Sequence, residues 1–518
     1  MSGPWDVIVI GTGIGGGTIG RRLTEQGLSV LFVEKGPAGH RFEETPITGD
    51  IWQAHARSLR GLSPRAVQAK IDGRESRFFA PLGAGVGGSS VFYAATLEQP
   101  ERHDLDDSKA RPHPTGGWPV GFDSMAPYFN QARQTYQIHG SKDPLGEPVQ
   151  NLAPPPAIAA MDAALLASLH ARGLHPYHAH TAIARLPDCL NCVGHKCPKK
   201  CKMDGRSAGV EPALATGRAE IMTDTTVIRV LGEDGQVTGV QARQNGMIIT
   251  LTAQYYVLAA GALASPNLLL ASTSAAWPNG AANSSGMVGR NLMFHLNEIF
   301  ALWPKGRIKM QEPSKAIALR DVYYQNQTRF GMVQAMGITA RYGEVLHYLN
   351  QMFDRSRFAK TAMLRPLLRL PAMLAERLLG GAQIFVGILE DLPYEHNRVV
   401  ATDDPDDIRF EYQLAPELHS RRRGFRRAIR RALRGHRMMF LHQQAELNFG
   451  HPCGTLRLGS DPHNSVLNAD CRAHDLDNLF VVDSSFFPTS MGVNPSLTIA
   501  ANALRIGNHI AKITKEKP

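Results

Sequence analysis

The stretch DVIVIGTGIGGGTIGRRLTEQGLSVLFVEKG, residues 6–36, decides the fold. Its first five residues are almost wholly apolar, which predicts a parallel strand buried on both faces. A turn follows at once, with Gly11, Gly13 and Gly16 in the G-x-G-x-x-G spacing. The first glycine permits a tight turn, the second lets a pyrophosphate approach the backbone, and the third lets a helix pack on the strand. We therefore expect a helix over residues 16–26 whose positive N-terminus faces bound phosphates.

A second strand and an acid complete this dinucleotide pattern. The run LSVLFV, residues 28–33, leads to Glu34, eighteen residues after Gly16. A carboxylate there can accept hydrogen bonds from a ribose, which favours an adenosine without a 2′-phosphate. A glycine-rich turn without a ligand is the alternative, but the order of strand, loop, helix, strand and acid favours dinucleotide binding. Residues 255–260, YYVLAA, predict a later strand of the same sheet, with an ordinary strand-to-helix turn as the alternative.

The bulk composition limits the class of protein. A chain of 518 residues exceeds the ~250–300 at which one core stops growing, so we expect two joined domains. The net charge of +10 could attract an acidic ligand, partner or membrane surface. No nucleic-acid motif accompanies this charge, so we expect no nucleic-acid partner. We see no secretory pattern at the N-terminus and no apolar run near the ~18 residues that span a bilayer, so we expect a cytoplasmic location.

Five ordered patches extend the pattern along the whole chain. They are PLGAGVGGSSVFYAATLEQP (81–100), GALASPNLLLAS (261–272), VGRNLMFH (288–295), HPCGT (451–455) and VNPSLTIAANALR (493–505). In these patches the chain resembles the glucose-methanol-choline (GMC) family of FAD-dependent oxidoreductases. Two details depart from the family pattern: Ser272-Thr273 replaces a Ser-Gly ending, and Tyr93 stands where many relatives carry asparagine.

The resemblance implies an α/β fold in which a Rossmann-like FAD-binding domain is interleaved with an α+β substrate domain. The FAD-binding domain is expected to comprise residues 1–40, 205–300 and 445–518. Residues 41–204 and 301–444 are expected to form the substrate-binding domain and a cysteine-rich loop. We expect a sheet of the substrate domain to cover one side of the flavin, with helices behind it, and the active site to lie at the domain junction.

The resemblance also implies further cofactor contacts. Gly87, Gly88 and Ser89 would lie beside the flavin, where a backbone without side chains lets the isoalloxazine approach. A tight turn is the alternative for these glycines. Asp483 resembles a residue near the ribityl chain of the flavin, and a helix or turn cap is its alternative.

The reacting centre is expected at two residues of the C-terminal region. Oxidising an alcohol requires a base with a pKa near working pH, and His451 resembles the active-site histidine of the family. Asn494 matches the partner position and is also expected to contact the cofactor. An amide cannot take a proton, but it can position a hydroxyl and stabilise developing negative charge. We therefore assign proton abstraction to His451 and orientation to Asn494.

The predicted function is FAD-dependent oxidation of an alcohol to a carbonyl, by proton abstraction and hydride transfer to flavin N5. The small-molecule substrate expected first is a sugar, glycoside or amino sugar, on the strength of the cysteine loop described next. A sterol or long-chain alcohol is the second choice. A flavin-bound lyase without net redox chemistry, also known in the family, is the alternative reaction class.

Four cysteines crowd into thirteen residues as C-x2-C-x4-C-x3-C: Cys189, Cys192, Cys197 and Cys201. Thiolates are ligands of iron-sulfur clusters and of structural zinc. The later part of the pattern resembles the cluster-binding segment of some sugar dehydrogenases of the family, where an iron-sulfur cluster would pass electrons to an acceptor protein. Here the first two cysteines are separated rather than adjacent, and no proline follows Cys201. Iron-sulfur, zinc, a disulfide and packed thiols all stay open.

Two amphipathic stretches suggest surface helices or contacts. Residues 421–437 contain nine arginines, and we expect a surface helix with a solvated basic face. Docking to an acidic partner or substrate is the alternative. Residues 359–380 carry an apolar stripe interrupted by Pro366 and Pro371. We expect this stripe to pack within the substrate domain; a lid over the substrate or a membrane-surface contact are the alternatives.

Overall fold

The glycine-rich N-terminal segment forms the strand, helix and strand that its sequence predicts. The computed structural model describes residues 5–39, 54–186, 189, 194, 196–199, 201–304, 315–354, 356 and 361–516. Within these residues β1 (Trp5–Ile10) leads into α1 (Ile14–Glu25) and β2 (Val30–Val33). The side chains of Val7, Ile8 and Val9 are fully buried, as expected of a parallel strand covered on both faces.

A five-stranded sheet gathers strands from distant parts of the chain. Its order is β21-β10-β1-β2-β6, and every neighbouring pair is parallel. The added strands are β6 (Ala219–Met222), β10 (Ala253–Leu258) and β21 (Leu479–Val481). The strand predicted at residues 255–260 therefore belongs to this sheet. A parallel sheet with helices packed on it confirms the predicted α/β class with a Rossmann-like domain.

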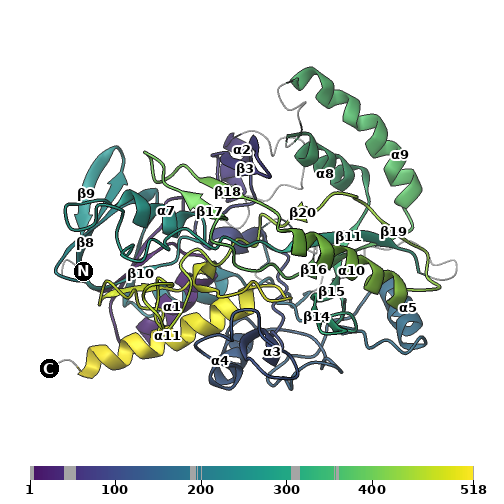
Figure 1. Cartoon of the computed structure of the whole chain (residues 1–518), viewed down its shortest axis with the longest axis horizontal. Coiled ribbons are helices and arrows are strands. Elements are labelled where there is room, and N and C mark those ends of the chain that lie inside the picture. The colour runs from purple at the N-terminus through teal and green to yellow at the C-terminus, as the bar shows by residue number, and fades with distance from the viewer. Residues whose placement is uncertain are drawn as a thin grey trace.

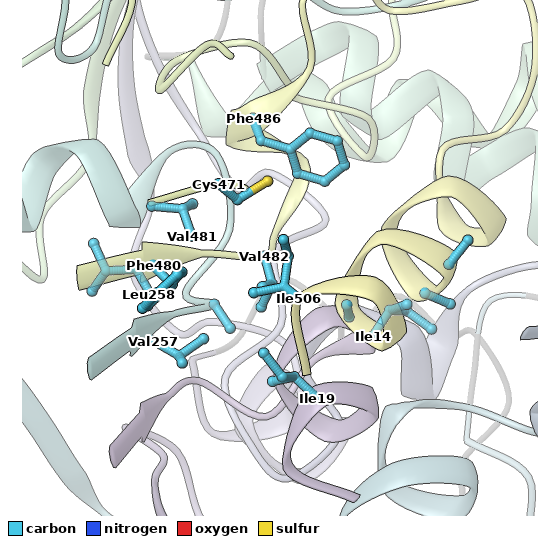
Figure 2. Packing of buried hydrophobic residues seen from close by; sticks show 14 of the residues in the cluster. Ile14, Ile19, Val257, Leu258, Cys471, Phe480, Val481, Val482, Phe486 and Ile506 are labelled. Atoms are coloured by element: carbon cyan, nitrogen blue, oxygen red, sulfur yellow. The ribbon is translucent and has the colours of Figure 1, made fainter. Parts of the chain in front are cut away.

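The main core lies between this sheet and two helices from opposite ends of the chain. α1 packs against α11 (Ser496–Glu516), and Figure 1 shows the two helices side by side beneath the sheet. Figure 2 shows Ile19 of α1 and Ile506 of α11 beside the apolar side chains of β10 and β21. This packing brings the last predicted motif, residues 493–505, next to the glycine loop.

A second, antiparallel sheet forms the other half of the molecule. Its order is β19-β11-β16-β15-β12-β5, and β20 also pairs with β11. Its strands are β5 (Tyr177–His178), β11 (Leu296–Leu302), β12 (Ile317–Leu319), β15 (Val333–Thr339), β16 (Gln383–Leu389), β19 (Met438–Phe440) and β20 (Glu446–Leu447). β11 crosses the domain boundary predicted at residue 300, and the domain division itself stays a prediction.

The arginine-rich stretch forms α10 (Pro416–Ala432), which packs on the antiparallel sheet. Phe425 and Ile429 are buried against β16, where a Cβ on Gly387 would lie only 2.7 Å from the Phe425 ring. The outer face carries the exposed arginines Arg423, Arg427 and Arg430, and the exposed Arg434 follows the end of the helix. The predicted basic surface helix is therefore present, and its apolar side holds it on the sheet.

The prediction that residues 359–380 pack within the substrate domain is wrong for most of their apolar side chains. The segment forms η4 (Ala362–Leu368) and α9 (Arg369–Leu379), at the edge of the molecule beside α8 (Tyr342–Asp354) (Figure 1). Leu367, Leu370, Leu374 and Leu378 are 60–70% exposed, whereas Leu379 on the opposite side is buried. One side of α9 packs inward and its leucine stripe faces outward. Among the described helices, none combines the length and apolar character needed to cross a bilayer.

Smaller elements complete the described part of the chain. Two further sheets have the orders β17-β18-β3-β4 and β7-β8-β9, and β13 pairs with β14. These strands are β3 (Val67–Ile71), β4 (Arg74–Phe78), β7 (Thr225–Glu233), β8 (Gln236–Gln244), β9 (Met247–Leu251), β13 (Tyr324–Gln325), β14 (Thr328–Arg329), β17 (Arg398–Val400) and β18 (Arg409–Tyr412). The remaining helices and helical turns are α2 (Ala54–Leu59), η2 (Gly88–Phe92), α3 (Arg102–Leu105), α4 (Phe122–Thr135), α5 (Ala160–His170), η3 (Gly205–Val210), α6 (Glu211–Ala215), α7 (Ala264–Ala271) and η5 (Ser484–Phe486).

Candidate active site

The first glycine loop opens onto a cavity at the N-terminus of α1. Gly11 has φ +97°, and a Cβ there would lie 2.5 Å from the carbonyl oxygen of Ala259. Gly13 is the N-cap of α1, where no side chain caps the helix and the first turn holds no acid. A Cβ on Gly13 would meet nothing within 4 Å. The helix terminus thus presents backbone N–H groups to open space, which suits a pyrophosphate.

Gly16 supports the loop from behind the cavity. A Cβ at Gly16 would lie 2.0 Å from the carbonyl oxygen of Gly11, so only glycine allows the helix to pack this closely. Gly16 does not line the cavity. Its predicted role in helix packing therefore fits its position.

Glu34 joins the first glycine loop to the second. One carboxylate oxygen accepts hydrogen bonds from the Thr12 hydroxyl at 2.5 Å and the Thr12 N–H at 3.2 Å. The other accepts from the N–H groups of Gly36 and Gly85, both at 3.0 Å. Burial raises the pKa of Glu34, although these hydrogen bonds and the Lys35 charge oppose the rise. Glu34 lines the cavity, and it also fixes the spacing of the two loops; its contact with a ribose stays a prediction.

The second glycine loop faces the first across the cavity. Gly87 and Gly88 have φ +99° and +55°, so this turn needs residues that tolerate left-handed backbone. A Cβ on Gly88 would lie 3.0 Å from the Cα of Gly13. Ser89 accepts a hydrogen bond from the Gly83 N–H at 2.8 Å, which holds its hydroxyl at the loop. Residues 87–89 therefore form a tight turn, and Gly88 and Ser89 of this turn line the cavity.

One cavity of about 560 Å³ brings most of the predicted site together. It extends from the glycine loops to the antiparallel sheet. The predicted residues that line it are Gly11, Gly13, Glu34, Gly88, Ser89, His451, Asp483 and Asn494. Gly16 and Gly87 lie behind the wall instead, where Gly87 donates its N–H to the Thr12 hydroxyl at 3.1 Å. The cavity is large enough for a cofactor end and a substrate end.

His451 contacts a second histidine that the sequence did not single out. The Nδ1 atoms of His451 and His295 lie 2.9 Å apart, and their rings meet nearly edge to face at 84°. Burial lowers the pKa of His295 to about 4 and that of His451 well below 6.5, with smaller contributions to His451 from His295 and Lys315. Both imidazoles are therefore neutral at pH 7.

The carbonyl groups around His295 determine where each proton lies. Nε2 of His295 lies 3.1 Å and 2.9 Å from the carbonyl oxygens of Ser490 and Met491, so it must donate. Neutral His295 then has a lone pair on Nδ1, and His451 must donate its own Nδ1 proton to it. This leaves the lone pair of His451 on Nε2, the nitrogen that a general base needs.

Asn448 completes the surroundings of His451. Its amide nitrogen lies 3.2 Å from His451 Nδ1 and 3.3 Å from Asn297 Oδ1. If His451 Nδ1 accepted from Asn448, His295 would have to carry two protons, against its low pKa. The Asn448 side chain therefore donates to Asn297 Oδ1. The backbone carbonyl of Asn448 accepts a hydrogen bond from the backbone N–H of His451 at 2.9 Å.

Asn494 lies on the same cavity, just before α11 begins. Its side chain is buried, and its Oδ1 has no hydrogen-bond partner among the residues that the structure describes. A buried amide atom without a partner is costly unless a bound molecule completes its hydrogen bond. Oδ1 is an acceptor, so the position suits contact with an N–H or O–H group of a cofactor or substrate.

Asp483 caps η5 and also reaches the cavity. Its carboxylate accepts from the Ser485 N–H at 2.8 Å, which is the cap that the sequence allowed as an alternative. It also accepts from the Gly261 N–H at 2.9 Å and the Ser265 hydroxyl at 2.5 Å. Burial raises the pKa of Asp483 against these hydrogen bonds. The residue ties the strand-to-helix turn at Gly261 to the C-terminal motif.

The described cysteines of the cluster, Cys189, Cys197 and Cys201, do not line the cavity. The Cys201 sulfur lies 3.4 Å from that of Cys197 and 3.9 Å from that of Cys189, and contact with these thiols raises the Cys201 pKa. Cys192 lies outside the described residues. Within the described ranges, no group of three or more histidine, cysteine or acidic side chains is arranged to hold a metal ion. The structure therefore adds no support for a bound metal.

Comparison with known proteins agrees with this architecture. Residues 6–297 and 393–503 match the N- and C-terminal models of one family, described as GMC oxidoreductase. The chain is 28% identical to 6'''-hydroxyparomomycin C oxidase of Streptomyces lividus and to paromamine 6'-oxidase of Streptomyces fradiae, over 98% of this chain and 91% of each relative. It is 26% identical to 2-methyl-1,2-propanediol dehydrogenase of Mycolicibacterium austroafricanum, over 98% of this chain and 95% of that protein.

A solved structure shows the same fold. Pyridoxine 4-oxidase from Mesorbium loti superposes with a TM-score of 0.63 at 20% identity, covering 98% of this chain and 99% of that one. Because one family model alone matches more than half of the chain, and the glycine loops and the C-terminal motif meet at one cavity, the protein belongs to the GMC oxidoreductases, enzymes that bind FAD.

Proposed function

We propose that this enzyme oxidises an alcohol to a carbonyl compound, with His451 as the base and Asn494 as its partner. The observation that carries the proposal is the lone pair on His451 Nε2, which the contact with His295 favours. His451 and Asn494 line the same cavity as the glycine loops. A base, a buried amide and a cofactor site on one cavity are what alcohol oxidation requires.

In the proposed step, His451 Nε2 takes the hydroxyl proton while the carbinol C–H bond breaks and the C=O bond forms. Bound FAD would supply the acceptor, at flavin N5, for the hydride that leaves this carbon. The Asn494 carboxamide hydrogen bonds to the substrate oxygen and stabilises the negative charge that develops there. Burial keeps His451 neutral at pH 7, so its lone pair is available.

The same cavity supplies the residues that would hold FAD. Gly11, Gly13 and the N-terminus of α1 would bind the pyrophosphate, and Glu34 would accept a ribose hydroxyl alongside its present donors. Further cavity residues would lie against the flavin and its ribityl chain: Gly88, Ser89, Asp483 and Asn494. Gly87 supports them from behind the wall through its hydrogen bond to Thr12. We assign this FAD-binding half to residues 1–40, 205–300 and 445–518, and the substrate half to 41–204 and 301–444.

A sugar or related polyol is the substrate class that we propose. Two of the relatives reported above are named as oxidases of paromamine and a hydroxyparomomycin, and a third as a diol dehydrogenase. The cavity wall near His451 includes the amides of Asn297, Gln334 and Asn448. Such polar side chains favour a substrate with several oxygens over a sterol or long-chain alcohol.

Anaerobic mixing tests the reaction class. Sugars, diols and long-chain alcohols are added in turn to the yellow enzyme, and flavin absorbance is followed. An alcohol oxidoreductase bleaches with at least one of them, and product analysis finds the carbonyl. A flavin that stays yellow while a substrate is cleaved indicates a lyase and contradicts the proposal.

The iron-sulfur cluster stays a separate prediction for the cysteine loop. Iron and acid-labile sulfide in stoichiometric amounts in the purified enzyme would support electron transfer to an acceptor protein. If the protein is purified without oxygen and contains neither iron nor acid-labile sulfide, that role is ruled out.

A further inference from the structure

The end of the cavity beyond His451 is formed by one face of the antiparallel sheet. Side chains alternate along a strand, so Gln334 and Met336 of β15 face the cavity together with Val386 and Ile388 of β16. The intervening residues of β16 pack toward α10 on the opposite face. Lys315, which precedes β12, joins this wall.

The backbone around Lys315 is adapted to its position. β15 has a register irregularity between Ala335 and Thr339, and Gly337 within it has φ +74°. A Cβ on Gly337 would lie 2.8 Å from the Cβ of Lys315. The bulge and its glycine thus make room for the lysine beside the cavity.

Lys315 carries a buried charge that the described residues do not pair. Its side chain is 4% exposed, and its ammonium forms no hydrogen bond or ion pair with any described residue. Burial lowers its pKa to about 8, against the opposing charge of Glu98, so the ammonium form predominates at pH 7. Glu98 itself already accepts from the Tyr177 hydroxyl at 2.9 Å and from Arg320 at 3.3 Å.

The carboxylates on the described cavity wall are engaged away from Lys315. Glu34 binds the two glycine loops, Asp483 binds Gly261 and Ser265, and Asp406 pairs with Lys35 at 2.9 Å. The described wall around Lys315 therefore has positive charge without an acidic side chain to receive a cationic substrate group.

Gln334 provides a second group without a partner. It is 3% exposed, and its Oε1 has no hydrogen-bond partner among the described residues. Gln334 pairs with Ala318 of β12, three residues after Lys315, and both side chains line the same cavity. The Lys315 ammonium needs an acceptor and Gln334 Oε1 needs a donor. A hydroxyl satisfies both, whereas a carboxylate pairs with the ammonium alone.

We propose that Lys315 and Gln334 form a subsite for a second oxygen-bearing group of the alcohol substrate. A hydroxyl there contacts both residues, a carboxylate pairs with the Lys315 ammonium, and the same charge excludes a substrate ammonium. The inference rests on the proposed function for the first oxygen, which His451 and Asn494 receive. The subsite would disfavour a cationic amino sugar as substrate. In this respect the enzyme would differ from the relatives named for paromamine compounds, with which it shares 28% identity. Hydroxy acids and uncharged polyols are the substrates that fit the subsite.

Ligand binding to the FAD-loaded enzyme tests this charge preference without turnover. Propionate and n-propylammonium have similar size and opposite charge, and each is titrated while the flavin absorbance is followed. We expect propionate to bind about tenfold more tightly or better, because like charges at a desolvated site repel strongly. Equal affinity, or tighter binding of n-propylammonium, would overturn the proposal with the wild-type enzyme alone.

The variant Lys315→Met keeps an unbranched side chain only one atom shorter and removes the charge. It should weaken propionate binding about tenfold and bring the two ligands to similar affinity. Lys70→Met, on the exposed surface of β3, is the matched control and should keep the wild-type preference. A preserved preference in Lys315→Met contradicts the assignment. If no alcohol reduces the flavin, the proposed function fails, whereas the two titrations still decide the charge of the subsite.

Discussion

His295 Nδ1 accepts the Nδ1 proton of His451. It is free to accept because the single proton of neutral His295 is on Nε2, which donates to the carbonyl oxygens of Ser490 and Met491. The relationship transmits a fixed tautomer from a fully buried histidine to one that lines the cavity. In the function that we propose, His295 is a positioning residue, since its effect on the substrate would pass through His451.

Replacing His295 by leucine should lower kcat about a hundredfold, because the His451 ring loses the acceptor that fixes its tautomer and orientation. KM should change much less, and FAD should stay bound. His295→Gln offers an amide oxygen to the same proton and should recover part of the rate. Stopped-flow flavin reduction measures both variants; equal rates in wild type and His295→Leu would show that the contact has no role in positioning.

Replacing His451 by alanine should leave a yellow enzyme whose anaerobic reduction is slower by about 10²–10⁴, the range that a general base contributes. The exposed histidine His463 supplies a control, and His463→Ala should reduce at the wild-type rate. Reduction of His451→Ala at the wild-type rate would refute proton abstraction by this residue.

The pH dependence of flavin reduction should reflect the low pKa of His451. Its neutral form is the base, so the rate should stay constant as pH falls from 8 through the ordinary histidine pKa of ~6.5. The rate should decline only at lower pH, where His451 takes up a proton in the folded enzyme. The measured quantity is kcat/KM, because its pH dependence reports the pKa values of the free enzyme. A decline centred near ~6.5 would mean that burial does not depress this pKa.

Replacing Asn494 by leucine should slow flavin reduction by about 10²–10³, the effect of losing one hydrogen-bond donor to a developing oxyanion. Asn494→His restores a donor at this position and should retain more of the rate than the leucine variant. Comparable rates in the wild-type and leucine variants would show that the buried amide does not act on the reacting oxygen.

Local sequence was sufficient for the nucleotide end of the fold. The strand, glycine spacing and acid of residues 6–34 lie close together along the chain, and their geometry follows from backbone rules that glycine alone satisfies. α1 begins two residues earlier than the helix predicted from Gly16, because Gly13 is its cap. His451 and Asn494 could be identified because each lies in a recognisable motif.

The contacts that tune the site depend on the tertiary structure. His295 ends the predicted patch VGRNLMFH, but only the folded chain brings its Nδ1 to His451. Lys315 has no motif at all, and its position follows from the bulge at Gly337. The leucine stripe of α9 shows the converse error, because helical spacing identifies an apolar face without showing what, if anything, covers it.

The two glycines Gly13 and Gly16 should separate cofactor binding from folding. A side chain on Gly13 enters open cavity, so Gly13→Val should fold normally but bind FAD at least about tenfold more weakly, because the valine occupies space that the pyrophosphate needs. A side chain on Gly16 would collide with the Gly11 carbonyl at 2.0 Å, so Gly16→Val should lower thermal stability before any cofactor is added. Gly343→Ala, in the open on α8, controls for loss of a glycine and should change neither property. Circular dichroism and flavin fluorescence measure the two effects; full FAD occupancy in Gly13→Val would place the cofactor elsewhere in the cavity.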